Sequence, residues 1–142
     1  MLVRLMYASR ALEPVRPETL NAILKKSTQN NPVSGVTGVL CFSGDIFLQV
    51  LEGGRLPVSK LYNRIAQDPR HTDVVLLSYE EIPERRFAGW AMGQVNMARL
   101  NAALLLKYSP TPVLDPYSMS GAVALAMFGE LVATASIMAD RG

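Results

Sequence analysis

The run Phe47-Leu48-Gln49-Val50-Leu51-Glu52-Gly53 decides the expected fold. It is apolar on both faces of an extended strand except for one amide, Gln49, before it ends at Glu52 and Gly53. A strand with two apolar faces is covered on both sides by other elements. A buried amide without a partner costs about 1–3 kcal/mol, so Gln49 needs a hydrogen-bonding partner in the protein or in a bound ligand. Tyr7 in another apolar strand and Asn31 at a helix end add polar groups that suit a flat heteroaromatic molecule.

The composition is that of one globular domain with a substantial core. Of the 142 residues, 49% are hydrophobic and 18% are charged. The formal net charge of +2 is too small to indicate a nucleic acid or an anionic membrane as partner. The single cysteine, Cys41, excludes an internal disulfide and a cysteine-based metal site, and the single histidine argues against a histidine site. We therefore expect no metal.

Neither end of the chain indicates export or membrane insertion. Residues 1–4 place Arg4 inside an apolar run without a cleavage pattern, which is not typical of a signal peptide. Residues 119–139 are the most apolar stretch, but Gly121, Gly129 and Glu130 interrupt it. A spanning helix needs about 20 apolar residues, so this stretch is read as a buried helix. We expect a cytoplasmic protein without a membrane partner.

Apolar periodicity and turn residues predict seven elements in the first two thirds of the chain. Pro17 suits a first helical turn and Asn31-Pro32 a helix end, while Ser43-Gly44-Asp45 suits a hairpin turn. The second helix carries an apolar stripe of Val58, Leu61, Tyr62 and Ile65, and residues 52–55 are expected to break the third strand. The predicted strands are residues 2–9, 36–42, 46–51, 74–82 and 90–95, and the predicted helices are residues 16–30 and 57–68.

This order, β-α-β-β-α-β-β, predicts a ferredoxin-like α+β sandwich with both helices on one face of the sheet. The other face would then carry exposed apolar side chains, among them Leu2, Met6, Leu48 and Val50. We expect residues 117–138 to cover it as a helix, alone or paired with residues 99–108. A homodimer interface is the competing explanation. The expected division is an α+β domain over residues 1–97 and a helical extension over residues 98–142.

Several polar residues are expected at one end of the helix-covered face. Strand alternation puts Tyr7 and Gln49 on that face, and Asn31 ends the first helix nearby. The end of the second helix adds a cation pair and an acid, which suits a phosphate or pyrophosphate; these residues are Arg64, Asp68, Arg70 and His71. Each residue alone also has a structural explanation, as a strand tyrosine, a helix terminator or a solvated turn.

In these residues the chain resembles the BLUF family of flavin-binding blue-light sensors. The resemblance covers roughly residues 2–95, and the residues after about 98 look like the terminal helices of short BLUF proteins without an output enzyme. The matching residues are Tyr7 with Ser9, the pair Asn30-Asn31, Ser34-Gly35-Val36-Thr37-Gly38-Val39-Leu40, the run from Phe47 to Gly53, Arg64-Ile65, Asp68-Pro69-Arg70-His71, and Phe87-Ala88-Gly89-Trp90-Ala91-Met92-Gly93.

The resemblance implies a flavin, FAD or less typically FMN, held between the two helices. It implies that Tyr7 donates an electron and then a proton after blue-light excitation, and that the amide of Gln49 rearranges. A reversible red-shifted state then signals through Trp90 and Met92 to the terminal helices or to a downstream protein. The implied cofactor contacts are Tyr7, Ser9, Asn30, Asn31, Gln49, Arg64, Asp68, Arg70 and His71.

Two other functions fit a ferredoxin-like fold. An acylphosphatase-like hydrolase would need a phosphate-cradling loop with an arginine, which Ser43-Gly44-Asp45 and Glu52-Gly53-Gly54-Arg55 do not resemble. A regulatory module that binds a small metabolite without photochemistry is the other. The expectation is a sensor rather than an enzyme, acting as a homodimer on an unidentified signalling partner.

Overall fold

The computed structural model describes residues 1–13, 16, 18, 33–88, 93–96 and 102–134. The helix expected over residues 16–30 lies almost entirely outside the described residues. The strands are β1 (Leu2–Ala11), β2 (Thr37–Ser43), β3 (Ile46–Gly54), β4 (His71–Ile82) and β5 (Gly93–Asn96). The helices are α2 (Arg55–Ala66), α3 (Ala102–Tyr108) and α4 (Gly121–Thr134), with a 3-10 turn, η2, at Pro116–Ser118.

The strands form one sheet in the order β4-β1-β3-β2-β5. β1 pairs antiparallel with both β3 and β4, β2 pairs antiparallel with β3, and β5 runs parallel to β2. The two central strands are buried on both faces, as the apolar pattern predicts: every residue from Ile46 to Gly53 is buried. This arrangement matches the ferredoxin-like α+β sandwich expected from the sequence.

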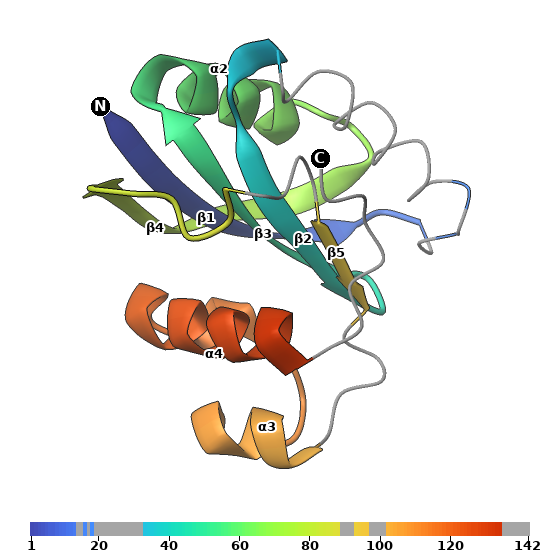
Figure 1. The fold of residues 1–142 in the computed structure, drawn as a ribbon. Coiled ribbons are helices and arrows are strands. Elements are labelled where there is room, and N and C mark those ends of the chain that lie inside the picture. Colours follow the sequence, from blue (N-terminus) through green and yellow to red (C-terminus); the bar gives the residue numbers. More distant parts are fainter. Residues whose placement is uncertain (14–15, 17, 19–32, 89–92, 97–101, 135–142) are drawn as a thin grey trace.

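Helix α2 covers one face of the sheet. Its apolar stripe of Val58, Leu61, Tyr62 and Ile65 packs on a cluster that contains Val3, Leu5, Tyr7, Val36, Leu40, Phe47 and Leu51. We call this the helix-side face. The stripe is the one predicted from helical spacing, and Figure 1 shows α2 above the sheet.

The prediction that residues 52–55 break the third strand is wrong. Gly53 and Gly54 remain paired with Val3 and Leu2 of β1, and α2 begins directly at Arg55. Both glycines keep their pairing with β1, and the backbone approaches closely at Gly53. A Cβ on Gly53 would lie 3.1 Å from the carbonyl oxygen of Gly35. Gly53 is therefore needed for close packing and does not end the strand.

Helix α4 covers the opposite face, below the sheet in Figure 1, with α3 beyond it. Ala124, Met127, Phe128 and Leu131 of α4 pack with Leu105 of α3 on a cluster formed by Met6, Ala8, Val39, Cys41, Ile46, Leu48 and Val50. The expected cover is confirmed, although the helix begins at Gly121 and residues 116–118 form a separate 3-10 turn. The division at residue 97 stays a prediction.

Strand β4 is longer than predicted and irregular. It begins at His71 rather than residue 74, and its pairing with β1 shifts register between Met6 and Tyr7 and again between Ala8 and Arg10. Strand β5 is described from Gly93, so its expected first residues, which include Trp90 and Met92, lie outside the described residues. Among the helices described here, none is both long and apolar enough to cross a lipid bilayer.

Candidate functional site

Tyr7 and Gln49 are direct cross-strand partners on β1 and β3. Both are buried, with 4% and 5% of their surface exposed, and both lie on the helix-side face. The hydroxyl of Tyr7 donates a hydrogen bond of 2.5 Å to Oε1 of Gln49. The alternation of two apolar strands therefore brings a phenol and an amide into contact inside the core.

The surroundings of Tyr7 keep its hydroxyl protonated. Burial raises the pKa of the phenol well above its usual value of 10.0, and the nearby Tyr62 and Asp68 act in the same direction. The ring of Tyr62, from α2, lies 5.7 Å from the ring of Tyr7 with a tilt of 55°. Tyr7 is thus a neutral hydrogen-bond donor across the physiological pH range.

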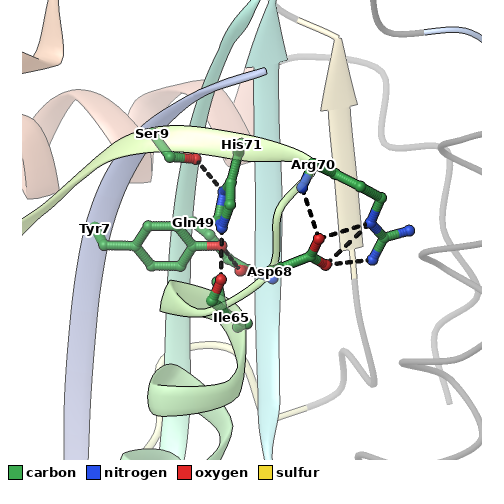
Figure 2. A network of polar contacts seen from close by, with 7 residues as sticks. All are labelled: Tyr7, Ser9, Gln49, Ile65, Asp68, Arg70 and His71. Atoms are coloured by element: carbon green, nitrogen blue, oxygen red, sulfur yellow. Dashed lines mark hydrogen bonds and ion pairs between the residues drawn. The ribbon is translucent and has the colours of Figure 1, made fainter. Parts of the chain in front are cut away.

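Ser9 and His71 extend this polar network along β1. Ser9 is fully buried, and its Oγ lies 2.9 Å from Nδ1 of His71 at the start of β4. Nε2 of His71 lies 2.5 Å from the backbone carbonyl oxygen of Ile65 near the end of α2. A carbonyl oxygen only accepts, so Nε2 carries a proton; in the neutral ring Nδ1 accepts from the Ser9 hydroxyl. Figure 2 shows His71 bridging the strand and the helix.

Asp68 and Arg70 lie beside this network, in the turn between α2 and β4 (Figure 2). Both carboxylate oxygens of Asp68 accept from Arg70, with Nη2 at 2.5 Å from Oδ2 and the backbone N at 2.9 Å from Oδ1. The hydrogen bond from Arg70 lowers the pKa of Asp68 to about 2. The turn therefore presents a fixed guanidinium that stays half exposed.

The structure brings together six of the residues singled out from the sequence. They are Tyr7, Ser9, Gln49, Asp68, Arg70 and His71, all at the end of the sheet where α2 meets β4. Arg64 lies in the last turn of α2 with its side chain exposed. Asn30, Asn31, Trp90 and Met92 lie outside the described residues.

Sequence reasoning missed the role of Glu52 on the opposite face. Its side chain is fully buried, yet it is charged and paired with Arg4 of β1. It also accepts hydrogen bonds from the backbone nitrogens of Arg86 and Phe87, at 3.0 and 2.7 Å. The signal was present, because an acid and a basic residue occupy matching positions in two apolar strands, and buried charges are normally paired.

The described part of the site fits the polar edge of a flavin. An amide such as Gln49 offers a donor and an acceptor on one group, and Tyr7 offers a hydroxyl beside it. Arg70 adds a half-exposed guanidinium in the neighbouring turn, a group that can hydrogen-bond a phosphate. A ferredoxin-like domain with a buried tyrosine–glutamine pair on the face that α2 covers is the class that fold and site define.

The chain belongs to the BLUF family. The family model described as sensors of blue light using FAD matches residues 2–93. The matched residues include all of β1, β2, β3, α2 and β4. The residues from α3 onward lie outside them.

Two curated relatives are similar to the same part of the chain. Photoactivated adenylate cyclase subunit beta of Euglena longa is 39% identical over 92 residues, which is 64% of this chain and 11% of that protein. The blue light- and temperature-regulated antirepressor BluF of Escherichia coli (strain K12) is 37% identical over 87 residues, which is 61% of this chain and 22% of that protein. The chain therefore spans only a small part of these relatives.

Two solved structures are similar over nearly the whole chain. The dark-state structure of the BLUF protein BlrB has a TM-score of 0.77 at 30% identity and covers 93% of this chain and 95% of its own. The photo-activated state of BlsA has a TM-score of 0.81 at 26% identity and covers 100% of this chain and 99% of its own. The terminal helices are thus part of the likeness.

Proposed function

We propose that this chain is a blue-light photoreceptor that holds FAD against Tyr7 and Gln49. The observation that carries the proposal is the buried hydrogen bond from Tyr7 to Oε1 of Gln49, with a length of 2.5 Å. Membership of a family of blue-light sensors that use FAD supports both the signal and the cofactor. FMN remains the alternative flavin.

When bound, the flavin supplies the blue-light absorption and an excited ring that accepts an electron from a nearby phenol. We propose that Tyr7, which is buried beside Gln49, is that phenol. A phenol that has lost an electron is strongly acidic, and the hydrogen bond gives its proton a path to Oε1 of Gln49. An amide carries a donor and an acceptor on one group. If Gln49 is protonated on Oε1, or if its amide rotates, a hydrogen-bond donor takes the position that the acceptor Oε1 held before. Return of the electron and the proton to Tyr7 restores the starting state.

The remaining site residues are proposed to hold the cofactor. Arg70 is fixed by Asp68 and is proposed to contact a phosphate, with Arg64 nearby in the last turn of α2. Asn30 and Asn31 are proposed to bind the polar edge of the ring. His71 uses both ring nitrogens on Ser9 and on the carbonyl oxygen of Ile65. We therefore propose that His71 acts on the site through Ser9.

The output is proposed to reach a separate signalling protein, through Trp90 or Met92 and the terminal helices. The named relatives include cyclase subunits and an antirepressor, so the domain is combined with different outputs. For this chain we propose a sensor in the cytoplasm that forms a homodimer and carries no catalytic activity of its own. The tight packing of α4 on the sheet supports the terminal helices as part of the switch.

An absorption spectrum of the purified protein, before and just after blue light, tests the proposal. The expected result is a flavin spectrum whose bands move slightly to the red and recover in darkness. Extraction and chromatography of the cofactor then distinguish FAD from FMN. A colourless protein that also fails to take up added FAD would contradict the proposal and favour the metabolite-binding or hydrolase alternatives.

A further inference from the structure

The two irregularities of β4 lie opposite the part of β1 that carries the site. Ala8 pairs with Val75 and Arg10 with Thr72, so Asp73 and Val74 together face the single residue Ser9. This is a β-bulge, in which one extra residue bends the strand and re-aims neighbouring side chains. Asp73 has a φ of 52°, in the left-handed region that non-glycine residues rarely adopt. A second extra residue, Leu77, separates the pairs of Tyr7 and Met6.

The segment before α4 contacts the first bulge. The hydroxyl of Tyr117, in the 3-10 turn η2, donates a hydrogen bond of 2.9 Å to the backbone carbonyl oxygen of Asp73. The guanidinium of Arg10 lies 4.8 Å from the centre of the Tyr117 ring, and its Nε lies 3.7 Å from Oδ2 of Asp73. Residues from β1, β4 and η2 thus meet at the bulge.

The first residue of α4 contacts the second irregularity. A Cβ on Gly121 would lie only 2.5 Å from the carbonyl oxygen of Leu77, and 3.1 Å from Cβ of Ser78. The start of α4 is therefore seated directly on the backbone of β4. Residues 117 and 121 contact the two places where β4 departs from regular pairing with Tyr7 and Ser9.

The bulge also connects to the site face. Val74 packs on the helix-side cluster that contains Tyr7, and Ser9 opposite the bulge hydrogen-bonds His71. His71 lies two residues before Asp73 on β4, so a change in the backbone at Asp73 and Val74 is expected to shift His71 relative to Ser9. A residue that holds the bulge in one conformation therefore fixes the distance and orientation between Ser9 and His71.

We propose that Tyr117 is a positioning residue of the site. By holding the Asp73 bulge, it sets the register of β4 against Tyr7 and Ser9 and so the geometry of the Ser9–His71 pair. The proposal rests on the proposed function only in taking the Tyr7–Gln49 region as the photosensory site. Tyr117 thus provides a second connection between the site and α4, separate from β5. Coupling is reciprocal, so a light-driven change at Ser9 is felt in turn by Tyr117 and the start of α4.

The test compares the ring of His71 in the wild-type protein and in Tyr117→Phe, with cofactor as purified. His71 is the single histidine of the chain, so its imidazole nitrogen signals in NMR are assigned without further variants. Tyr117→Phe removes one hydroxyl and keeps the ring beside Arg10. The matched control is Ser118→Ala in the same turn, whose hydroxyl bonds the carbonyl oxygen of Asp115 and not β4.

The expected result is that Tyr117→Phe shifts the His71 ring signals in the dark while Ser118→Ala leaves them unchanged. A loss of global stability alone would not move a native-state ring signal. We also expect the dark-recovery rate of Tyr117→Phe to differ from that of the wild type by roughly two- to tenfold, the range for losing one neutral hydrogen bond from one of two states. Ring signals that coincide with those of the wild type would overturn the proposal. The NMR comparison needs no light, so it decides this inference even for a protein that shows no light-driven band shift.

Discussion

Arg4 and Glu52 face each other across β1 and β3 and form a buried ion pair, with Nε of Arg4 2.8 Å from Oε2 of Glu52. They lie three positions along the same two strands from Tyr7 and Gln49, but on the opposite face. Glu52 also accepts hydrogen bonds from the backbone nitrogens of Arg86 and Phe87. The centre of the Phe87 ring lies 5.6 Å from the centre of the Phe128 ring of α4. The strand pair that carries the site thus also anchors the segment before β5 and α4.

Removing the carboxylate of Glu52 should destabilise the fold strongly. Glu52→Ala leaves Nε of Arg4 and two backbone donors without their acceptor, and only Nη1 of Arg4 keeps a partner, the half-exposed Glu80. Breaking a buried pair in this way costs about 3–5 kcal/mol. Urea unfolding of Glu52→Ala and wild type measures the difference.

The control for this prediction is Glu81→Ala, which removes an exposed ion pair with Arg55. An exposed pair contributes about 0–1 kcal/mol, so this variant should unfold near the wild-type midpoint. Equal losses of unfolding free energy in the two variants would contradict a stabilising role for the buried carboxylate of Glu52.

The two glycines of α4 should respond to alanine with opposite signs. Gly121→Ala puts a methyl group 2.5 Å from the carbonyl oxygen of Leu77, so we expect a loss of about 1–3 kcal/mol from strain. Gly129→Ala meets only a nitrogen of Arg86 at 3.8 Å. It should raise the free energy of unfolding by up to about 1 kcal/mol, because alanine is the better helix former.

Thermal unfolding of both variants is sufficient to check this prediction. If Gly121→Ala proved as stable as the wild type, α4 would not be seated on β4 in solution. That result would also weaken the case for Tyr117, which depends on the same seating.

Local sequence signals predicted the parts of the fold that depend on neighbouring residues. Alternating apolar residues and the turn at Ser43-Gly44-Asp45 placed β2 and the start of β3 to within one residue. The apolar stripe of α2 was predicted correctly, and the excess of apolar side chains on the second face predicted its helical cover. Each of these signals is a short-range pattern or a balance of apolar surface.

The irregular features could not be predicted in this way. The bulge at Asp73 interrupts a two-residue alternation that the sequence otherwise supports, and its partner Tyr117 is 44 residues away. Glu52 and Gly53 look like a strand end, yet long-range contacts with Phe87 and Gly35 keep them in the strand. For the site, the alternation of apolar residues correctly predicted that Tyr7 and Gln49 share one face. It could not predict that both ring nitrogens of His71 bond to other groups of the protein.

Acid should abolish the contribution of Asp68 to stability. Its hydrogen bond with Arg70 lowers the pKa of Asp68 from 3.8 to about 2 in the folded protein. A carboxyl group with a lowered folded pKa stabilises the fold above its unfolded pKa, and this contribution is lost as the pH falls through the folded value. The stability difference between wild type and Asp68→Asn should therefore shrink as the pH is lowered from 4 towards 2. A difference independent of pH in that range would show that the ion pair does not form.

Substitution of Gln49 should separate binding from signalling. Gln49→Ala removes the acceptor of the Tyr7 hydroxyl while leaving Arg70 and Asp68 in place. We expect the variant to bind flavin and to lose the light-driven band shift. Tyr79→Phe, an exposed tyrosine on β4, is the matched control and should keep the full shift. A Gln49→Ala protein with a wild-type shift would remove the amide from the mechanism.

A light-minus-dark absorption spectrum of Tyr7→Phe beside that of the wild type, at equal flavin content, shows whether the Tyr7–Gln49 hydrogen bond is the switch. This substitution removes only the hydroxyl that donates to Oε1 of Gln49. We expect a reversible red shift of the flavin bands in the wild type and none in Tyr7→Phe. A wild-type shift in the variant would contradict the claim that the Tyr7–Gln49 hydrogen bond is the switch.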